Sequence, residues 1–120
     1  MRTKRIIVSL SVLLLVTGAA LADGEAQKRW ELMNQIRQEK FDTILPEVMR
    51  ENGVEMWITV NREGYDDPLT EDFGKGYVGS YGYYVFSDRG VDRIERAALG
   101  IGTYLIEENG AYDIVTNDFD

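Results

Sequence analysis

The chain has 120 residues, with 13 Lys and Arg against 21 Asp and Glu, and it contains neither His nor Cys. This length suits one domain of ordinary size. The absence of His and Cys excludes imidazole general bases, thiolate nucleophiles, disulfides and the usual zinc ligand sets. A formal net charge of −8 repels a nucleic acid backbone, and no basic stripe compensates for it, so we expect no nucleic acid partner.

The first segment has the pattern of a secretory signal peptide. Positively charged side chains precede an apolar run over residues 6–16, and Ala20-Leu21-Ala22 forms a small-x-small cleavage site. This run is short for a membrane-spanning helix, which needs about 20 residues. We therefore expect a signal peptide over 1–22, an exported protein that is periplasmic or secreted, and no stable membrane anchor after cleavage. An uncleaved membrane tether is the alternative.

Two helical patterns follow the predicted cleavage site. Apolar residues recur every three or four positions over 25–38, which predicts an amphipathic helix. A second such pattern covers 41–49. Pro46 interrupts it, because proline lacks an amide hydrogen and restricts the residue before it, so we expect a kink or a fresh helix start there. Asn52-Gly53 then predicts the end of the helix, with Gly supplying left-handed geometry.

The next segment predicts a buried strand and a long loop. The nearly continuous apolar run 56–60 comes directly after the helix stop, and it predicts a central strand that is buried on both faces. Residues 61–82 are polar and rich in glycine, which predicts a long loop.

The last third of the chain predicts further strands. Residues 83–98 predict a hairpin with its turn at Asp88-Arg89-Gly90. Gly100-Ile101-Gly102 is expected to break the strand pattern. The segments 104–106 and 112–115 predict one more short strand pair.

A glycine pattern at 74–79 matches G-x-G-x-x-G, in which glycines allow close approach of a pyrophosphate. No predicted strand precedes it, and a strand rather than a helix follows, so no helix N-terminus would hold a phosphate. Lys75 is the last Lys in the chain, so the lysine of a kinase-type arrangement is missing as well. We therefore interpret the glycines as part of a close-packed loop.

Acidic side chains cluster after the predicted strand, at Asp66, Asp67, Glu71 and Asp72. Clustered carboxylates suit Ca²⁺, but Pro68 stands where the second ligand of an EF-hand loop is required. The pattern favours a solvated charge cluster, and we predict no metal-binding residue.

Aromatic residues gather in the predicted strands, at Trp57, Tyr81, Tyr83, Tyr84 and Phe86. Such residues could form a ligand platform. Aromatic side chains in strands usually pack in a core, and we favour that interpretation.

Asn61 and Arg62 are the candidate substrate-binding residues. They end the predicted strand, which is where open α/β sheets place ligands. Arg62 could hold a carboxylate through two hydrogen bonds, but Glu63, Asp66 and Asp67 are available as ion-pair partners within the chain, which favours a structural role. We predict no catalytic residue.

The string KFDTILPEVMRENGVEMWITVNRE, from Lys40 to Glu63, resembles the opening helix and first strand of the creatinase-like N-terminal domain. That domain precedes the pita-bread catalytic domain of Xaa-Pro aminopeptidases, prolidases and creatinases. The strings YVFSDRG and RIER, within 84–96, are similar to a later strand pair of exported members.

The resemblance implies an α/β fold in which N-terminal helices precede a mixed sheet, creatinase N-terminal-like and ribonuclease H-like, and incomplete because its final strand and helix are lacking. It implies a noncatalytic domain over 23–120 that shapes substrate access and makes subunit contacts. Its partner would be its own catalytic domain or another subunit of the parent protein.

The family's reaction depends on two divalent metal ions, held in the catalytic domain by two Asp, one His and two Glu. No residue of this chain matches that set, so we expect no cofactor in it. The alternative hypothesis is a stand-alone acidic binding module of the cell envelope, without enzymatic activity, that uses the segment 61–82 as its contact surface.

Overall fold

The structure is a computed structural model that describes residues 22–65, 67–74, 76–102 and 104–117. The chain divides into two compact units, 1–33 and 34–120. The predicted signal peptide, up to residue 21, lies outside the described residues. Within the described part of the chain, no helix is both long and apolar enough to cross a membrane.

In the first unit, residues 22–33 are helical. The side chain of Gln27 donates a hydrogen bond of 2.9 Å to Glu31, one helical turn further along. The second unit begins with helical residues 34–39, so the predicted helix over 25–38 is confirmed.

The predicted fresh start at Pro46 is also confirmed. A π-helical turn, η1 (Lys40–Ile44), is followed by α2 (Leu45–Glu51), and Pro46 lies in the first turn of α2. Proline clashes with the carbonyl four residues back in a regular helix and cannot donate to it. The wider π turn before α2 accommodates this ring.

The end of α2 is a hydrogen-bonded glycine cap. The amide of Val54 donates to the carbonyl of Met49 at 2.8 Å, and the amide of Gly53 donates to that of Arg50 at 3.2 Å. Gly53 has a φ of 65°, which a residue without a Cβ adopts at little cost. These two bonds form a Schellman motif and confirm the predicted helix stop.

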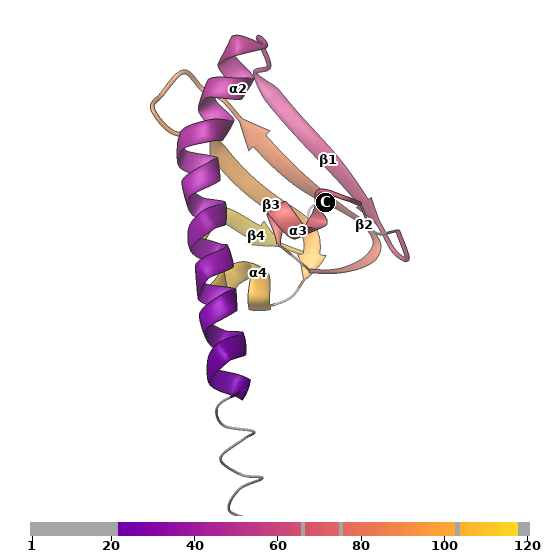
Figure 1. The fold of residues 1–120 in the computed structure, drawn as a ribbon. Coiled ribbons are helices and arrows are strands. Elements are labelled where there is room, and N and C mark those ends of the chain that lie inside the picture. Colours follow the sequence, from indigo (N-terminus) through magenta and orange to yellow (C-terminus); the bar gives the residue numbers. More distant parts are fainter. Residues whose placement is uncertain (1–21, 66, 75, 103, 118–120) are drawn as a thin grey trace, which may run out of the picture. The chain divides into compact units, whose positions relative to one another are not determined.

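Four strands form one mixed sheet in the order β1-β2-β3-β4 (Figure 1). They are β1 (Met56–Arg62), β2 (Tyr77–Ser87), β3 (Glu95–Gly102) and β4 (Ile114–Thr116). The first two pairings are antiparallel, and β4 runs parallel to β3. The fold is therefore mixed α/β, with a helix followed by a four-stranded sheet.

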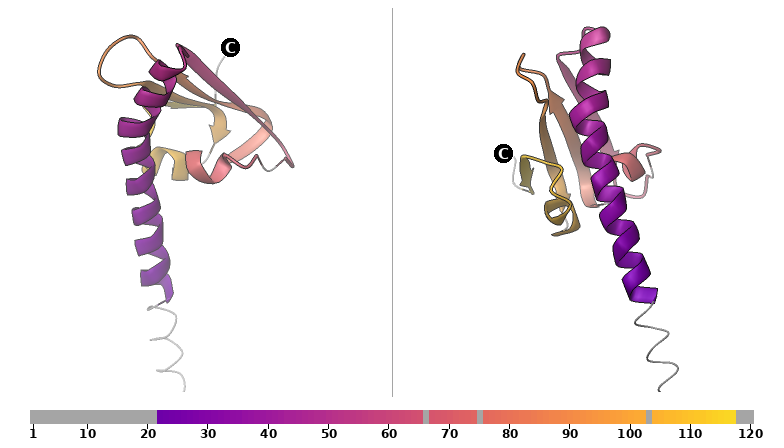
Figure 2. Two further views of the ribbon diagram at one scale, coloured as in Figure 1. Left: turned by 45° about the horizontal axis from the view of Figure 1, so that its top comes forward. Right: turned by 60° about the vertical axis from the view of Figure 1, so that its left-hand side comes forward.

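The core lies on one face of the sheet, beside the helical residues 34–51, of which α2 is the last part (Figure 2). The short helices α3 (Thr70–Phe73) and α4 (Tyr104–Glu108) contribute to the same core. Aromatic rings form its centre: Phe41 lies edge-on to Phe86 at 5.2 Å, and Phe73 lies 5.1 Å from Tyr84. Both Tyr84 and Phe86 are fully buried.

The predicted position of the strand over 56–60 is wrong, although the strand exists. It forms the edge strand β1, and only β2 pairs with it among the described residues. Its side chains alternate: Thr59 is buried, whereas Ile58 and Val60 are half exposed. The apolar run predicted burial on two faces, but helices cover only one.

The predicted long loop over 61–82 is wrong in part. It contains α3, and β2 begins within it at Tyr77. Glycine usually marks a loop, but Gly82 lies inside β2, where an added Cβ would stand 3.0 Å from the carbonyl oxygen of Gly100. Close approach of two strands therefore explains this glycine.

The C-terminal predictions need two corrections. The predicted hairpin exists, but its connection extends over 88–94, so β3 begins at Glu95 rather than directly after the predicted turn at 88–90. Gly100-Ile101-Gly102 forms the last part of β3 and does not interrupt it. The segment predicted as a strand at 104–106 lies in α4, and only the second predicted strand is observed, as β4. A parallel neighbour needs a crossover connection, so the chain cannot form a hairpin here.

Candidate functional site

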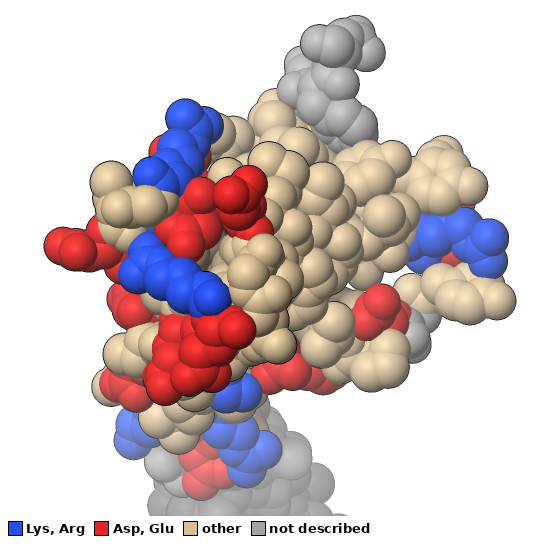
Figure 3. All heavy atoms as spheres, turned by 90° about the horizontal axis from the view of Figure 1, so that it is seen from above, with Lys and Arg blue, Asp and Glu red and all other residues tan. Residues whose placement is uncertain are grey.

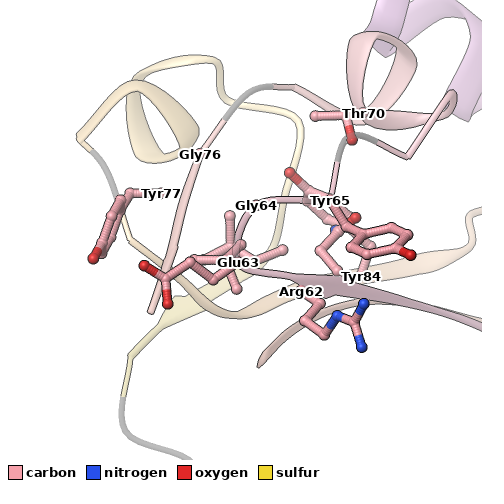
Figure 4. Close-up of a pocket in the computed structure, with 11 residues that line it drawn as sticks. Arg62, Glu63, Gly64, Tyr65, Thr70, Gly76, Tyr77 and Tyr84 are labelled. Atoms are coloured by element: carbon pink, nitrogen blue, oxygen red, sulfur yellow. The ribbon is translucent and has the colours of Figure 1, made fainter. Parts of the chain in front are cut away.

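A hollow of about 230 Å³ lies at the end of β1 (Figure 4). Both residues predicted from the sequence, Asn61 and Arg62, line it, together with Tyr65 and Tyr84. Asn61 is 8% exposed and comes from the core-facing side of β1. The end of the strand therefore brings the two predicted residues together in one cavity.

The guanidinium of Arg62 stacks on an aromatic ring. Its central carbon lies 4.2 Å from the centroid of Tyr65, a cation–π distance, and Figure 4 shows Arg62 beneath that ring. The ion pair predicted for Arg62 stays a prediction, because Asp66, one of its three proposed partners, lies outside the described residues. Stacking leaves the edge of the guanidinium available for a carboxylate.

Tyr84, which lines the hollow, already uses its hydroxyl in a hydrogen bond within the chain. The Tyr84 hydroxyl donates to the carbonyl of Gly74. Burial raises the pKa of this hydroxyl, so Tyr84 stays protonated and serves as a structural donor. Other polar side chains that line the hollow include those of Asn61, Arg62, Glu63 and Thr70.

Two glycines of the pattern at 74–79, Gly74 and Gly76, stand close to neighbouring side chains, as the packing interpretation expects, whereas a Cβ on Gly79 would meet nothing within 4 Å. The pattern starts directly after α3, and its last three residues belong to β2. Its second residue, Lys75, lies outside the described residues. A Cβ on Gly76 would stand 2.3 Å from Ile101 Cγ2. Gly76 is therefore needed because the chain crosses Ile101 at close range.

Two residues of the acidic cluster, Glu71 and Asp72, contact basic side chains elsewhere in the fold. The Lys40 ammonium lies 2.9 Å from the carboxylate of Asp72. The buried guanidinium of Arg37 donates to the backbone carbonyls of Asp72 (2.8 Å) and Glu71 (3.1 Å). Asp66 lies outside the described residues, and the rest of the described chain contains no group of three acidic residues that could hold a metal ion.

The second surface is the sheet face opposite the helices, which we call the bare face. Two rows of paired residues cross all four strands: Ile58, Val85, Ala97 and Ile114 form one, and Val60, Tyr83, Leu99 and Thr116 form the other. Ile58, Val60 and Ile114 are 50%, 54% and 56% exposed. This is a contiguous apolar surface in the described part of the chain.

One end of the bare face is hollowed and ringed by paired charges. Met56, Val85 and Ile114 line this depression. At its rim, Arg89 pairs with Glu95 at 2.7 Å and Arg93 with Asp113 at 2.6 Å. Figure 3 shows a large group of charged side chains on the left, a smaller one on the right and uncharged surface between them. An apolar floor with a charged rim is typical of a docking surface.

The aromatic residues divide between the two faces. Tyr84 and Phe86 are buried, and Trp57 packs partly buried against them, so the core interpretation is confirmed for these three. It is wrong for Tyr81, which is exposed, and Tyr83 lies on the bare face. The alternation within Tyr83–Ser87 was the available signal for this division.

In comparisons with known proteins, no family model, curated protein or solved structure matches this chain.

Proposed function

We propose that this chain is the exported, noncatalytic N-terminal domain of a larger protein related to the Xaa-Pro aminopeptidases and creatinases. Its helix and mixed sheet would then be a partial creatinase N-terminal, ribonuclease H-like fold. In that protein it would shape substrate access and contact its own catalytic domain or another subunit. The resemblance of the string 40–63 suggests the family, and the bare face is the observation that carries the role.

The bare face supports a role in assembly. Soluble monomers rarely expose contiguous apolar patches of more than a few hundred Å², and larger patches mark interaction surfaces. The three apolar residues of β1 on this face, Met56, Ile58 and Val60, are each at least half exposed. Covering them with another part of the parent protein removes this apolar surface from water.

The residue inventory supports a domain without peptidase activity of its own. The two-metal reaction of the family uses an imidazole ligand, and this chain has no His. We expect purified 23–120 to show no turnover of X-Pro peptides with added Mn²⁺ or Co²⁺. Turnover that copurifies with the chain and requires the metal would overturn the proposal.

A substitution pair tests the role of the bare face. Val85→Lys places a charge at its centre, whereas Val48→Lys places one on the exposed side of α2. We expect Val85→Lys to reduce binding of an apolar dye and self-association of the purified chain, with unchanged circular dichroism. Val48→Lys should leave both unchanged. Wild-type chain that is monodisperse and binds no dye would contradict an assembly role.

The coding sequence offers an independent test of the family. An in-frame continuation that supplies Asp, Asp, His, Glu and Glu in that order would support the metallopeptidase assignment. A continuation with an unrelated domain would reject the family, while leaving the result of the dye experiment intact.

The second candidate is a stand-alone acidic binding module that uses the segment 61–82. The hollow at Asn61 and Arg62 favours it, because it offers a buried amide beside a cation stacked on Tyr65. This candidate predicts a monomer that unfolds cooperatively and binds a small carboxylate such as acetate. Arg62→Ala should abolish that binding, whereas Arg89→Ala, outside the hollow, should not.

A further inference from the structure

The outer edge of β1 carries backbone groups that no other described residue pairs with. β1 is seven residues long and lies at the end of the sheet, with β2 as its neighbour. An exposed edge strand presents a row of donors and acceptors that can template another strand. The hydrogen-bond register shows which residues carry these groups.

Two hydrogen bonds fix that register. The amide of Asp88 donates to the carbonyl of Glu55 at 2.8 Å, and the amide of Glu63 donates to that of Ser80 at 3.3 Å. Residues in an antiparallel pair alternate between hydrogen-bonded and non-hydrogen-bonded positions. Odd-numbered residues of β1 therefore bond to β2, and Met56, Ile58 and Val60 point their amides and carbonyls outward. The carbonyl of Arg62, at the end of the strand, accepts the amide of Tyr65 at 3.1 Å.

The same residues carry the side chains of the bare face. Met56, Ile58 and Val60 are half exposed on it, and the intervening residues face the core. One segment therefore leaves both its backbone groups and its apolar side chains without a covering element among the described residues. The usual protections of an edge, such as Lys, Pro or a bulge, are missing within Met56–Arg62.

A second copy of this chain could pair with the backbone edge of β1 or cover its apolar side chains, but not both. Antiparallel pairing of two β1 strands about Thr59 would place Ile58 opposite Val60 of the other copy. That arrangement joins two bare faces into one larger exposed face. Stacking the bare faces of two copies covers the side chains but leaves the backbone edge open. A different strand, continued by a segment that lies over the bare face, satisfies both.

We propose that the outer edge of β1 is the acceptor for a β-strand of a partner polypeptide, which makes β1 a central strand. The inference rests on the proposed function, in which the rest of the parent protein supplies this strand. Its side chains would be apolar opposite Met56, Ile58 and Val60. A carboxylate would lie opposite the exposed guanidinium of Arg62, because opposite charges at paired positions of neighbouring strands attract each other.

A synthetic strand tests the acceptor directly. The probe is a peptide as long as β1 that alternates Val and Thr and ends in Glu, with the amides of one edge N-methylated to prevent self-pairing. Added in excess to the purified chain, it should slow amide hydrogen exchange at Ile58 and Val60 by about tenfold or more. Exchange at Thr59, which bonds to β2, should change little.

Two versions of the probe report the direction of pairing. Glu at the C-terminal end matches Arg62 in a parallel arrangement, and Glu at the N-terminal end matches it in an antiparallel one. The version that gives the stronger protection identifies the orientation. Equal protection by both would remove Arg62 from the recognition, and absence of protection with both would overturn the inference.

Matched variants separate edge pairing from contact with the bare face. Ile58→Pro removes an outward amide, which an edge strand tolerates, and should abolish protection at Val60. Val85→Ser alters the neighbouring position of the bare face and should only weaken it. If Ile58→Pro fails to fold by circular dichroism, Ile58→Lys serves instead, because an edge lysine opposes strand addition.

The remaining outcome concerns the second copy. Concentration-dependent protection of Ile58 without any peptide would show that β1 pairs with itself and would overturn the inference. These results are independent of the peptidase assay and of the coding sequence. A failed family assignment therefore leaves a positive exchange result standing, and a negative exchange result leaves the family assignment standing.

Discussion

Arg50 of α2 and Asp88, the first residue after β2, form an ion pair with two hydrogen bonds. Nε of Arg50 lies 2.9 Å from one carboxylate oxygen of Asp88, and Nη2 lies 3.0 Å from the other. The same carboxylate accepts the amide of Gly90 at 2.9 Å. The pair connects the C-terminal part of α2 to the β2–β3 connection, so it fixes the helix against that end of the sheet.

The Arg50–Asp88 pair predicts a loss of stability in acid. The hydrogen bond from Arg50, supported by the Gly90 amide, lowers the pKa of Asp88 to about 2 from its ordinary 3.8. A carboxyl with a lowered pKa in the folded state stabilises the fold above its unfolded pKa and loses that effect as the pH falls. The contribution should therefore be complete above pH 4 and disappear between about pH 4 and 2.

Urea unfolding across this pH range measures the effect. The difference in unfolding free energy between wild type and Asp88→Asn should be constant above pH 4 and shrink toward pH 2. The exposed Glu51→Gln removes the same charge outside this pair and serves as the control for the change in net charge. A difference independent of pH would contradict the prediction.

Substitutions of the two partners Arg96 and Asp42 are expected to lower the stability of the fold by different amounts. Arg96 is 3% exposed, and its guanidinium donates to Asp42 and lies 5.2 Å above the ring of Phe41. Its Nε has no hydrogen-bond partner among the described residues. Asp42→Asn leaves a buried cation poorly compensated and should cost about 1–3 kcal/mol. Arg96→Met removes the buried charge with similar volume and should cost less, because well-packed apolar replacements of buried ion pairs are often neutral.

Chemical denaturation of the two single variants and the double variant tests this order. If Arg96→Met lowers the unfolding free energy more than Asp42→Asn does, the contacts of the guanidinium contribute more to stability than the compensation of its charge by Asp42. In that case its bond to the carbonyl of Ala111, at 3.4 Å, is the remaining candidate for the difference.

The local elements were predictable because their signals are local. The helix over 25–38, the restart at Pro46 and the stop at Gly53 follow from apolar spacing and from the backbone chemistry of proline and glycine. The place of β1 in the sheet was not predictable in this way. It depends on which segments pair over long distances, and an apolar run reports only a preference for burial.

The candidate site shows the same division. Asn61 and Arg62 were predicted because strand ends place side chains at the rim of a sheet, and both line the hollow. The bare face was not predicted, because it depends on which side of the sheet α2 covers. The part of β2 up to Gly82 was predicted as loop, because this glycine reflects a contact with Gly100, which is distant in the sequence.

Two glycines of β2 predict a contrast. A Cβ on Gly82 would stand 2.6 Å from Ile101 Cγ1 and 3.0 Å from the carbonyl oxygen of Gly100, whereas one on Gly79 meets nothing within 4 Å. Gly82→Ala should therefore destabilise the fold by about 1–3 kcal/mol, as other overpacked sites do. Gly79→Ala should change little. Equal midpoints for the two variants in urea would show that the strands can move apart at Gly82.

Tyr84 and Tyr112 predict a loss of stability in alkali. Their rings stack at 5.3 Å, and the Tyr112 hydroxyl donates to the carbonyl of Phe73 at 2.6 Å. Burial raises the pKa of both hydroxyls above 10, because the phenolate is poorly solvated there. A raised folded pKa gives stability that is complete below pH 10 and lost above it.

Alkaline titration followed by phenolate absorbance and circular dichroism tests this coupling. Phenolate formation at Tyr84 and Tyr112 should occur together with loss of secondary structure, since ionisation requires the core to open. Tyr84→Phe combined with Tyr112→Phe should shift alkaline unfolding to higher pH, although the loss of two hydrogen bonds should lower stability at pH 7 by about 1–3 kcal/mol. Ionisation of these hydroxyls in a chain that keeps its circular dichroism would show that water reaches the stacked pair in the folded state.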